Sequence, residues 1–167
     1  MGIIGYPNVG KSTLISHISR AKSKIADYPF TTKEPILGIV DIDDGHMVFA
    51  DMPGLIEGAH RGKGLGDIFL RHIERTNILL HMVDMAPSGE RDPYDDYVSI
   101  NKELMLYGKN VGKKPQVVAC NKMDLPEAKK KLNIFSKEIG KKVFPISAAT
   151  GAGVREMLEE IWRVLKA

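Results

Sequence analysis

A glycine-bracketed octapeptide near the start of the chain has the residue types and spacing that hold nucleotide phosphates. Gly5 and Gly10 bracket it, and Lys11 and Ser12 close it. Glycines let the backbone turn its N–H groups toward an anion, while the lysine can reach the β and γ phosphates and the serine hydroxyl can bind Mg²⁺. An apolar run precedes the octapeptide and a helical pattern follows it, which is the context of a phosphate loop and not of a chance glycine turn. These features predict a nucleoside triphosphate site made by Gly5, Tyr6, Pro7, Asn8, Val9, Gly10, Lys11, Ser12 and Thr13.

A second set of polar residues, later in the chain, has the chemistry to choose the base. The carboxylate of Asp124 can accept hydrogen bonds from guanine N1–H and from the exocyclic N2 amine, and adenine offers neither donor in that arrangement. Asn121 can tie this loop to the phosphate loop, and the stem of Lys122 can cover the base. The small residues after the last apolar run leave room for backbone N–H groups to approach the base oxygen. We therefore predict a guanine site formed by Asn121, Lys122, Met123, Asp124, Ser147, Ala148 and Ala149.

Two further segments have the composition of loops that respond to the γ-phosphate. Asp51 can hold Mg²⁺ through a water molecule, and the Gly54 amide can bind the γ-phosphate. We include Met52 and Pro53 in the nucleotide site, and the glycine-rich residues 55–66 are expected to be a mobile switch and not a plain connection. In residues 27–34, a threonine can complete the Mg²⁺ shell. Reasoning from the residues does not choose between Thr31 and Thr32, and a capping or strand-surface threonine is the alternative for either.

Short apolar runs that alternate with helical patterns predict the elements that position these motifs. Asp44-Gly45 is a hairpin signal, so the second and third strands should be antiparallel, and the other strands should be parallel. Such a sheet binds ligands at the carboxyl ends of its strands, where the motifs fall. Apolar residues at helical spacing mark helices near residues 13–18, 97–107, 128–139 and 154–165. The expected strands are residues 2–5, 36–42, 47–51, 78–84, 117–121 and 143–146.

Composition places the chain among single globular domains, spanning residues 1–167. Hydrophobic residues make up 43% of it, and the net charge of +3 does not by itself indicate nucleic-acid binding, so we expect no DNA partner. The clustered lysines are interpreted as a solvated surface, with contact to RNA phosphates as the alternative. Cys120, in an apolar run, is expected to be a buried, inert thiol. No apolar stretch approaches the roughly 20 residues of a membrane helix, and no signal peptide is visible, so a cytoplasmic protein is expected.

Taken in order, the five motifs resemble those of translation-factor-class GTPases across the whole chain. The double threonine in residues 27–34 and the stretch at 51–59 are, more narrowly, similar to the G domain of the Obg family. The resemblance implies a Ras-like P-loop fold, a six-stranded mostly parallel sheet flanked by five helices, here as a domain excised from a longer protein. It also implies binding of GTP and GDP and a role in assembling the large ribosomal subunit, with ribosome or ribosomal RNA contacts through the full-length protein. By the same resemblance Thr32 becomes the Mg²⁺ ligand beside Ser12, and the nucleotide site gains Phe30, Thr31, Thr32, Lys33 and Glu34.

Residues around the γ-phosphate favour slow hydrolysis. Many GTPases orient the attacking water with a glutamine at the position held here by Leu55, which cannot form a hydrogen bond. Obg proteins often have serine where this chain has Asn8, which leaves open kinship with potassium-stimulated bacterial GTPases. Family analogy supports an Asn8 oxygen that binds K⁺ where other GTPases use an arginine finger; a loop-shaping hydrogen bond from Asn8 to its own backbone is the alternative. We assign catalysis to Lys11, Thr32, Gly54 and Asn8, and give His60 and Arg61 little weight. The competing hypotheses are a nucleotide-dependent binding module that does not hydrolyse GTP and, more remotely, an ATP-using enzyme.

Overall fold

A seven-stranded sheet organises the chain in the computed structural model, which describes residues 1–20, 24–25, 36–43, 45–51 and 65–167. The strand order is β2-β3-β4-β1-β5-β6-β7. Strands β4, β1, β5, β6 and β7 are mutually parallel, and β2 and β3 are antiparallel to their neighbours. The strands are β1 (Gly2–Ile4), β2 (Lys24–Ile25), β3 (Ile36–Ile42), β4 (Gly45–Asp51), β5 (Leu79–Asp84), β6 (Gln116–Asn121) and β7 (Val143–Pro145).

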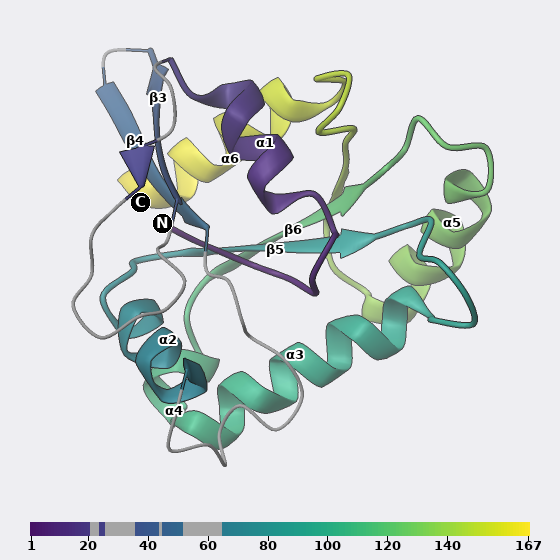
Figure 1. Ribbon diagram of the computed structural model, residues 1–167, viewed down its shortest axis with the longest axis horizontal. Helices are drawn as coiled ribbons and strands as arrows, with labels where there is room; N and C mark the ends of the chain where they lie inside the picture. Colours follow the sequence, from purple (N-terminus) through teal and green to yellow (C-terminus); the bar gives the residue numbers. More distant parts are fainter. Residues whose placement is uncertain (21–23, 26–35, 44, 52–64) are drawn as a thin grey trace.

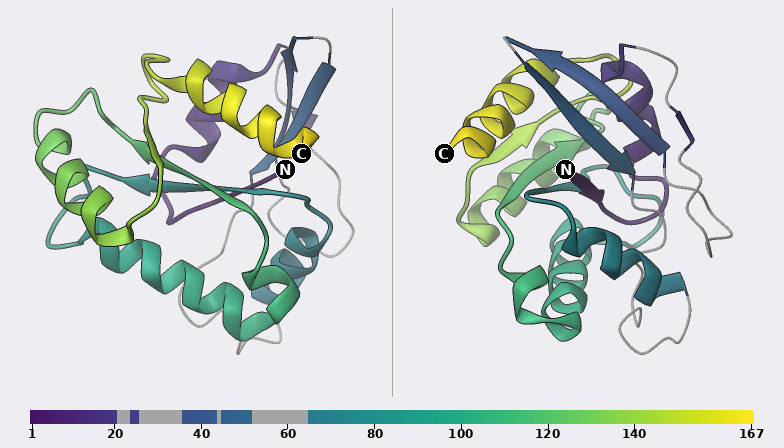
Figure 2. Two further views of the ribbon diagram at one scale, coloured as in Figure 1. Left: turned by 180° about the vertical axis from the view of Figure 1, so that it is seen from behind. Right: turned by 90° about the vertical axis from the view of Figure 1, so that its left-hand side faces the viewer.

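Helices cover both faces of this sheet, as Figures 1 and 2 show. One face packs against α1 (Lys11–Ile18) and α6 (Val154–Lys166). The other face packs against α2 (Leu65–Glu74), α3 (Pro93–Tyr107), the single turn α4 (Lys109–Gly112) and α5 (Ala128–Ile139). All six residues of β5 are buried, as expected for a central parallel strand that is covered on both sides. The predicted α/β class with a mostly parallel sheet is therefore confirmed.

The sheet and helix inventory differs from the prediction in two short elements and in α2, a helix whose range the sequence pattern had not marked and whose first two residues, Leu65 and Gly66, were expected to belong to the mobile loop. All six expected strands are present within two residues of their predicted ends, and the hairpin between β3 and β4 is antiparallel as expected. A seventh strand, Lys24–Ile25, pairs with β3, and the described residues hold six helices where five were expected. A two-residue strand and a four-residue turn are too short to produce a hydrophobic period, so the sequence pattern carried no signal for either.

Two titratable side chains lie in the interior of the sheet. Cys120, on β6, is fully buried, and this burial raises the pKa of its thiol to about 12, which confirms the prediction of an inert residue. His81, on β5, stacks on the Tyr97 ring with 4.9 Å between ring centroids. Burial lowers the pKa of His81 to about 4, so the ring is neutral at physiological pH. Both side chains therefore serve as packing material in the core.

The parallel strands bring the sequence motifs to one edge of the sheet. The loops that follow β1, β6 and β7 all leave from the carboxyl ends of neighbouring or next-neighbouring strands. Ligand sites of parallel α/β sheets form at this edge. In the part of the chain that the structure describes, no helix combines the length and apolar character needed to span a membrane.

Candidate functional site

The phosphate loop joins β1 to α1 in a backbone shape that requires glycine at two positions. Gly5 and Gly10 have φ angles of +156° and +103°. A Cβ atom on Gly5 would lie 2.6 Å from the carbonyl oxygen of Met82, and one on Gly10 would lie 2.4 Å from Nδ2 of Asn121. Contacts this short cannot be relieved without moving backbone or a buried amide, so side chains are excluded at both ends of the loop. The two predicted glycines thus keep the loop close to β5 and β6.

Lys11 places a cation inside this loop. Its side chain is only 8% exposed, and Nζ donates hydrogen bonds to the carbonyl oxygens of Gly5 and Tyr6, both at 3.1 Å. Burial lowers the pKa of Lys11, while the nearby carboxyl of Asp51 acts in the opposite direction. An ammonium group held by neutral carbonyls in a buried loop has unused capacity for an anion. This is the position expected of the phosphate-binding lysine.

Asp51 and Ser12 supply oxygen atoms beside Lys11. Asp51 ends β4 opposite Ile3 of β1, and its buried Oδ1 has no hydrogen-bond partner among the described atoms. Burial raises the pKa of Asp51, and the charge of Lys11 opposes the rise. Ser12, the second residue of α1, is exposed at the mouth of the loop. An unpartnered carboxylate oxygen near Lys11, and a serine hydroxyl on the residue that follows Lys11, are the kind of hard oxygen ligands that Mg²⁺ prefers.

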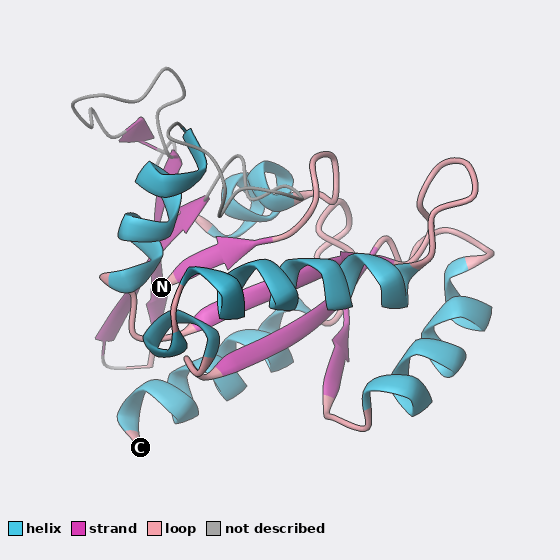
Figure 3. Cartoon of the chain, turned by 90° about the horizontal axis from the view of Figure 1, so that it is seen from below, coloured by secondary structure: helices cyan, strands magenta, loops and turns pink. Residues whose placement is uncertain are grey.

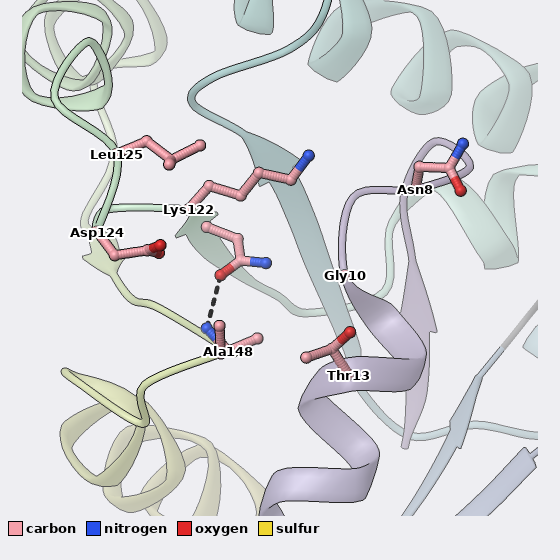
Figure 4. A pocket seen from close by; sticks show the side chains of 9 residues that line it. Asn8, Gly10, Thr13, Lys122, Asp124, Leu125 and Ala148 are labelled. Atoms are coloured by element: carbon pink, nitrogen blue, oxygen red, sulfur yellow. Dashed lines mark hydrogen bonds between the residues drawn. The ribbon is translucent and has the colours of Figure 1, made fainter.

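Asn121 joins three loops. Its link to the phosphate loop was predicted from the motif, and its link to the loop after β7 was not. Its Nδ2 donates to the carbonyl oxygen of Val9 at 2.7 Å. Its Oδ1 accepts from the N–H of Ala148 at 2.8 Å, the bond drawn as a dashed line in Figure 4. The side chain is 3% exposed. Both polar atoms of the amide are therefore satisfied, and each bond crosses to a different motif. Asn121 fixes the phosphate loop relative to the loops after β6 and β7.

A cavity of about 230 Å³ opens where these loops meet. Figure 4 shows Asp124, Lys122 and Leu125 on one side of it and Asn8 and Thr13 on the other. Oδ1 of Asp124 accepts a hydrogen bond from Ser147 Oγ at 2.7 Å, and the same Oγ accepts from the N–H of Thr150 at 3.2 Å. The carboxylate of Asp124 is thus held at the cavity, and Oδ2 has no hydrogen bond within the described residues. The arrangement offers an acceptor edge for a planar ring bearing adjacent N–H groups.

Asn8 lies at the cavity in a left-handed conformation, with a φ angle of +64°. The side chain is exposed and forms no hydrogen bond to the backbone within the described part of the chain. The self-capping alternative considered from the sequence is therefore absent from this structure. The amide oxygen of Asn8 is available to a ligand at the phosphate loop.

Tyr6 anchors the outside of the phosphate loop to α3. Its hydroxyl donates to Ser99 Oγ at 3.1 Å, and the guanidinium of Arg91 lies 4.6 Å from the centre of its ring. Neither contact was predicted, because the two partners lie more than 80 residues away along the chain. Helix α3 thereby supports the loop from behind.

Asp84 is a functional candidate that the sequence interpretation missed. Its Oδ2 accepts a hydrogen bond from Lys122 Nζ at 2.6 Å, and its Oδ1 accepts from the N–H of Ala86 at 2.8 Å. Asp84 is 5% exposed and ends β5 directly beside Asn121 of β6. The ion pair holds Lys122, whose φ is +69°, across the cavity. A polar residue at the carboxyl end of an apolar strand was the available signal.

Removing the charge of Asp84 tests this positioning role. In Asp84→Asn we expect nucleotide to dissociate about tenfold faster, since a hydrogen bond between charged groups contributes roughly 1.5–3 kcal/mol and only part of that loss reaches the ligand. The measurement is the dissociation rate of a fluorescent GDP analogue. Glu160→Gln is the matched control, because it removes the partner of Lys142 and Arg163 far from the cavity. An unchanged rate in Asp84→Asn, or an equal change in the control, would contradict the role.

Several predicted site residues lie outside the described part of the chain. These are Phe30, Thr31, Thr32, Lys33 and Glu34 in the first switch segment and Met52, Pro53 and Gly54 in the second, together with Leu55, His60 and Arg61. Their assigned roles remain predictions. Of the described candidates, the structure brings the phosphate-loop residues, Asp51, the 121–124 loop and the 147–149 loop to one edge of the sheet.

The sequence matches a family of known GTPases and several curated relatives. The family model described as "50S ribosome-binding GTPase" matches residues 1–122. GTPase Obg of Caldicellulosiruptor saccharolyticus is 54% identical over 170 residues, covering 99% of this chain and 40% of that protein. The chain thus spans about two fifths of the length of the curated relatives it matches.

Two solved structures are similar over nearly the whole chain. The structure of Era in complex with MgGDPNP and nucleotides 1506–1542 of 16S ribosomal RNA superposes with a TM-score of 0.71 at 28% identity, covering 97% of this chain and 55% of that one. The G domain of the T. maritima FeoB iron transporter has a TM-score of 0.72 at 23% identity, covering 97% and 95% of the two chains. The second likeness shows the fold alone.

Proposed function

The chain belongs to the family of 50S ribosome-binding GTPases, and on that premise we propose that it binds GTP and GDP in the cavity at the strand ends and hydrolyses GTP slowly with Mg²⁺. The observation that carries the proposal is the Asn121 bridge, which locks a lysine-bearing phosphate loop to the loop that presents Asp124. A phosphate cradle and an acceptor for a purine edge are thereby fixed at one site. Similarity to GTPase Obg over 99% of the chain supports the same nucleotide.

Each described group has one task in this proposal. Asp124 accepts hydrogen bonds from the guanine N1–H and N2 amine, and the Lys122 stem covers the ring. Lys11 binds the β and γ phosphates together with the inward N–H groups of the loop. Ser12 and Asp51 are the Mg²⁺ ligands on the described side, with Thr32 as the third. We further propose that the Gly54 amide detects the γ-phosphate, which makes its loop the switch. Bound Mg²⁺ would neutralise charge that develops on the phosphates.

We propose that the nucleotide cycle serves assembly of the large ribosomal subunit, in the cytoplasm. Support comes from the family description, which names the 50S ribosome, and from 54% identity to GTPase Obg. The related Era structure, which contains both a magnesium-bound nucleotide and ribosomal RNA, gives a precedent for joining the two ligands on such a fold. Because the chain spans two fifths of the Obg relatives, ribosome contacts are assigned to the full-length protein.

Phosphate release tests the hydrolysis proposal, and its dependence on potassium tests the proposed role of Asn8. We expect phosphate release to be at least about tenfold faster in KCl than in NaCl at equal ionic strength. The reason is that K⁺ at Asn8 would stabilise transition-state charge at the place where an arginine finger, in GTPases that have one, raises the rate about 10³- to 10⁵-fold. The variant Asn8→Gly should lose this stimulation by K⁺. Glycine is chosen because it accepts the observed positive φ, whereas alanine would add backbone strain. The measurement is phosphate release under single-turnover conditions with Mg²⁺.

Two variants sharpen that result. Asn8→Asp keeps a side-chain oxygen and should retain K⁺ stimulation, while Asn133→Ala, an exposed asparagine on α5, should leave it unchanged. Equal rates in both salts would reject the Asn8 proposal and shift attention to the switch loop or an outside activator. No phosphate release in either salt, with GTP still bound, would favour the non-hydrolysing module.

A further inference from the structure

Helix α5 and the turn after it contain the positive charge excess of the whole chain. Residues 128–142 hold six of the 24 basic residues and one of the 21 acidic residues. The rest of the chain holds 18 basic and 20 acidic residues, which is a slight negative excess. A charge asymmetry this local indicates a surface for an anionic partner better than the overall value of +3 does.

The lysines on the outer side of α5 face away from the protein. The helix packs through Ala128, Leu132, Phe135 and Ile139, and the Phe135 ring meets Tyr97 edge-on at 5.7 Å. Lys130 and Lys137 fall on the opposite stripe and are exposed. Two turns of helix separate them by about 10 Å along the axis. Figure 1 labels α5 at the right-hand edge of the molecule, and Figure 3 shows the same edge from below, so the helix lies at the periphery. The exposure of Lys130 and Lys137 makes this stripe accessible.

Of the six lysines in residues 128–142, only Lys142 forms an ion pair with a described residue. Lys142 pairs with Glu160, and Lys141 lies 3.5 Å from the hydroxyl of Tyr97. Lys129, Lys130 and Lys137 form no ion pair with any described residue. Exposed lysines without an ion pair can neutralise phosphates without first breaking a contact within the protein. The surface is therefore poised to gain free energy from phosphate contacts.

We infer that the exposed surface of α5 and the turn after it, defined by Lys129, Lys130, Lys137 and Lys141, binds the phosphate backbone of duplex RNA. A phosphodiester backbone fits because flexible lysines neutralise phosphates without a fixed geometry. A membrane surface fits poorly, since an interfacial helix needs a free apolar face and that of α5 is already used by the core. The choice of RNA over DNA rests on the proposed ribosomal role. The lysine surface itself rests on the structure alone.

This surface is separate from the nucleotide cavity. Lys130 and Lys137 do not line the cavity, whose wall ends at Leu125, three residues before α5 begins. Substitutions on the outer stripe should therefore leave GTP binding and hydrolysis unchanged. If substitutions on this surface abolish RNA binding and leave nucleotide turnover intact, the effect is due to the surface. If the unmodified chain shows no nucleotide turnover, it is the proposed function that fails.

The test compares two charge reversals in the 167-residue chain. The variant is Lys130→Glu with Lys137→Glu, and the matched control, Lys102→Glu with Arg155→Glu, changes the net charge equally at exposed positions on α3 and α6. The probe is a fluorescent RNA duplex of about 16 base pairs, followed by anisotropy over a series of KCl concentrations with GDP present. In the α5 variant we expect at least a tenfold weaker complex at low salt and a log–log salt slope smaller by about 1.8, for two lost phosphate contacts.

The outcomes are decisive in either direction. Loss confined to the α5 variant supports the inference. Equal loss in the control pair, or no loss in either, overturns it, because the attraction would then reflect overall charge or another surface. A DNA duplex of the same sequence that binds as tightly, or vesicles of anionic lipid that bind more tightly than RNA, would overturn the assignment to RNA.

Discussion

Replacing Asp124 by asparagine is expected to weaken GTP binding about 10²- to 10⁴-fold, since two hydrogen bonds to a charged acceptor contribute roughly 1.5–3 kcal/mol each. The asparagine amide presents donors where guanine also presents donors, so the lost bonds are replaced by a mismatch. Xanthosine triphosphate carries a carbonyl oxygen in place of the exocyclic amine, and its affinity should rise. The measurement is the dissociation constant of each nucleotide, by competition against a fluorescent GDP analogue.

The structure sharpens this expectation beyond the motif. Ser147 Oγ donates to Asp124 Oδ1 at 2.7 Å, so in the variant the same hydroxyl favours the asparagine oxygen in that place. The amide nitrogen then takes the position of Oδ2 and faces the cavity. Adding Ser147→Ala to Asp124→Asn removes this preference, and we expect it to reduce the gain in xanthine affinity.

A neighbouring carboxylate provides the control for charge. Glu127 is exposed in the same turn, forms no capping hydrogen bond and does not line the cavity. Glu127→Gln should leave both affinities within about twofold of the parent, as is usual for surface changes. If Asp124→Asn bound GTP as well as the parent, or if Glu127→Gln weakened it equally, Asp124 would not be the base-reading residue.

What the sequence predicted well are features set by local residue types. The phosphate loop, the hairpin at Asp44-Gly45 and the strand ends follow from glycine conformations and apolar periods, which neighbouring residues determine. The expected bridge from Asn121 to the phosphate loop is present because a motif at the end of β6 must lie near the loop after β1 in a parallel sheet. The resemblance to the Obg family is confirmed by 54% identity to its members across the chain.

What the sequence did not predict depends on pairing between distant residues. The ion pair of Asp84 with Lys122 joins residues 38 apart, and nothing in either local sequence identifies the partner. The anchoring of Tyr6 by Ser99 joins residues 93 apart and depends on where α3 packs. Leu125 lines the cavity from the turn after Asp124, although the motif had indicated only residues 121–124. Contacts of this kind are determined by tertiary packing, which the local patterns of a single sequence do not predict.

The outward lysines of α5 illustrate a third case, in which the sequence showed the residues but not their arrangement. Clustered lysines read from the chain alone are most simply a solvated face. The structure shows that the apolar stripe of this helix packs into the core. Lys129, Lys130 and Lys137, by contrast, have no anionic partner among the described residues. Because one side of α5 is buried and the other carries lysines without ion pairs, the lysine run becomes a defined surface whose binding to RNA can be tested.

Replacing Lys11 by methionine is expected to lower the rate of GTP hydrolysis about 10²- to 10³-fold, the effect of removing one group that stabilises charge in a transition state. In the structure the ammonium group is enclosed by its own loop and donates hydrogen bonds to the carbonyl oxygens of Gly5 and Tyr6. The carboxylate of Asp51 is the negative charge that acts on its pKa. The methionine variant removes the cation from both the phosphates and Asp51. The pKa of Asp51, already raised by burial, should rise further, which weakens its hold on Mg²⁺ as well.

An arginine at the same position separates charge from fit. Lys11→Arg keeps the positive charge, yet the side chain is only 8% exposed and its terminal nitrogen is close to two carbonyl oxygens, so a planar guanidinium has no room without opening the loop. We therefore expect Lys11→Arg to hydrolyse GTP nearly as slowly as Lys11→Met, while Lys102→Met, at an exposed site on α3, hydrolyses it at the parent rate. Single-turnover phosphate release measures all three. A Lys11→Arg variant as fast as the parent would show that charge alone suffices and that the fit of the ammonium in its loop contributes little.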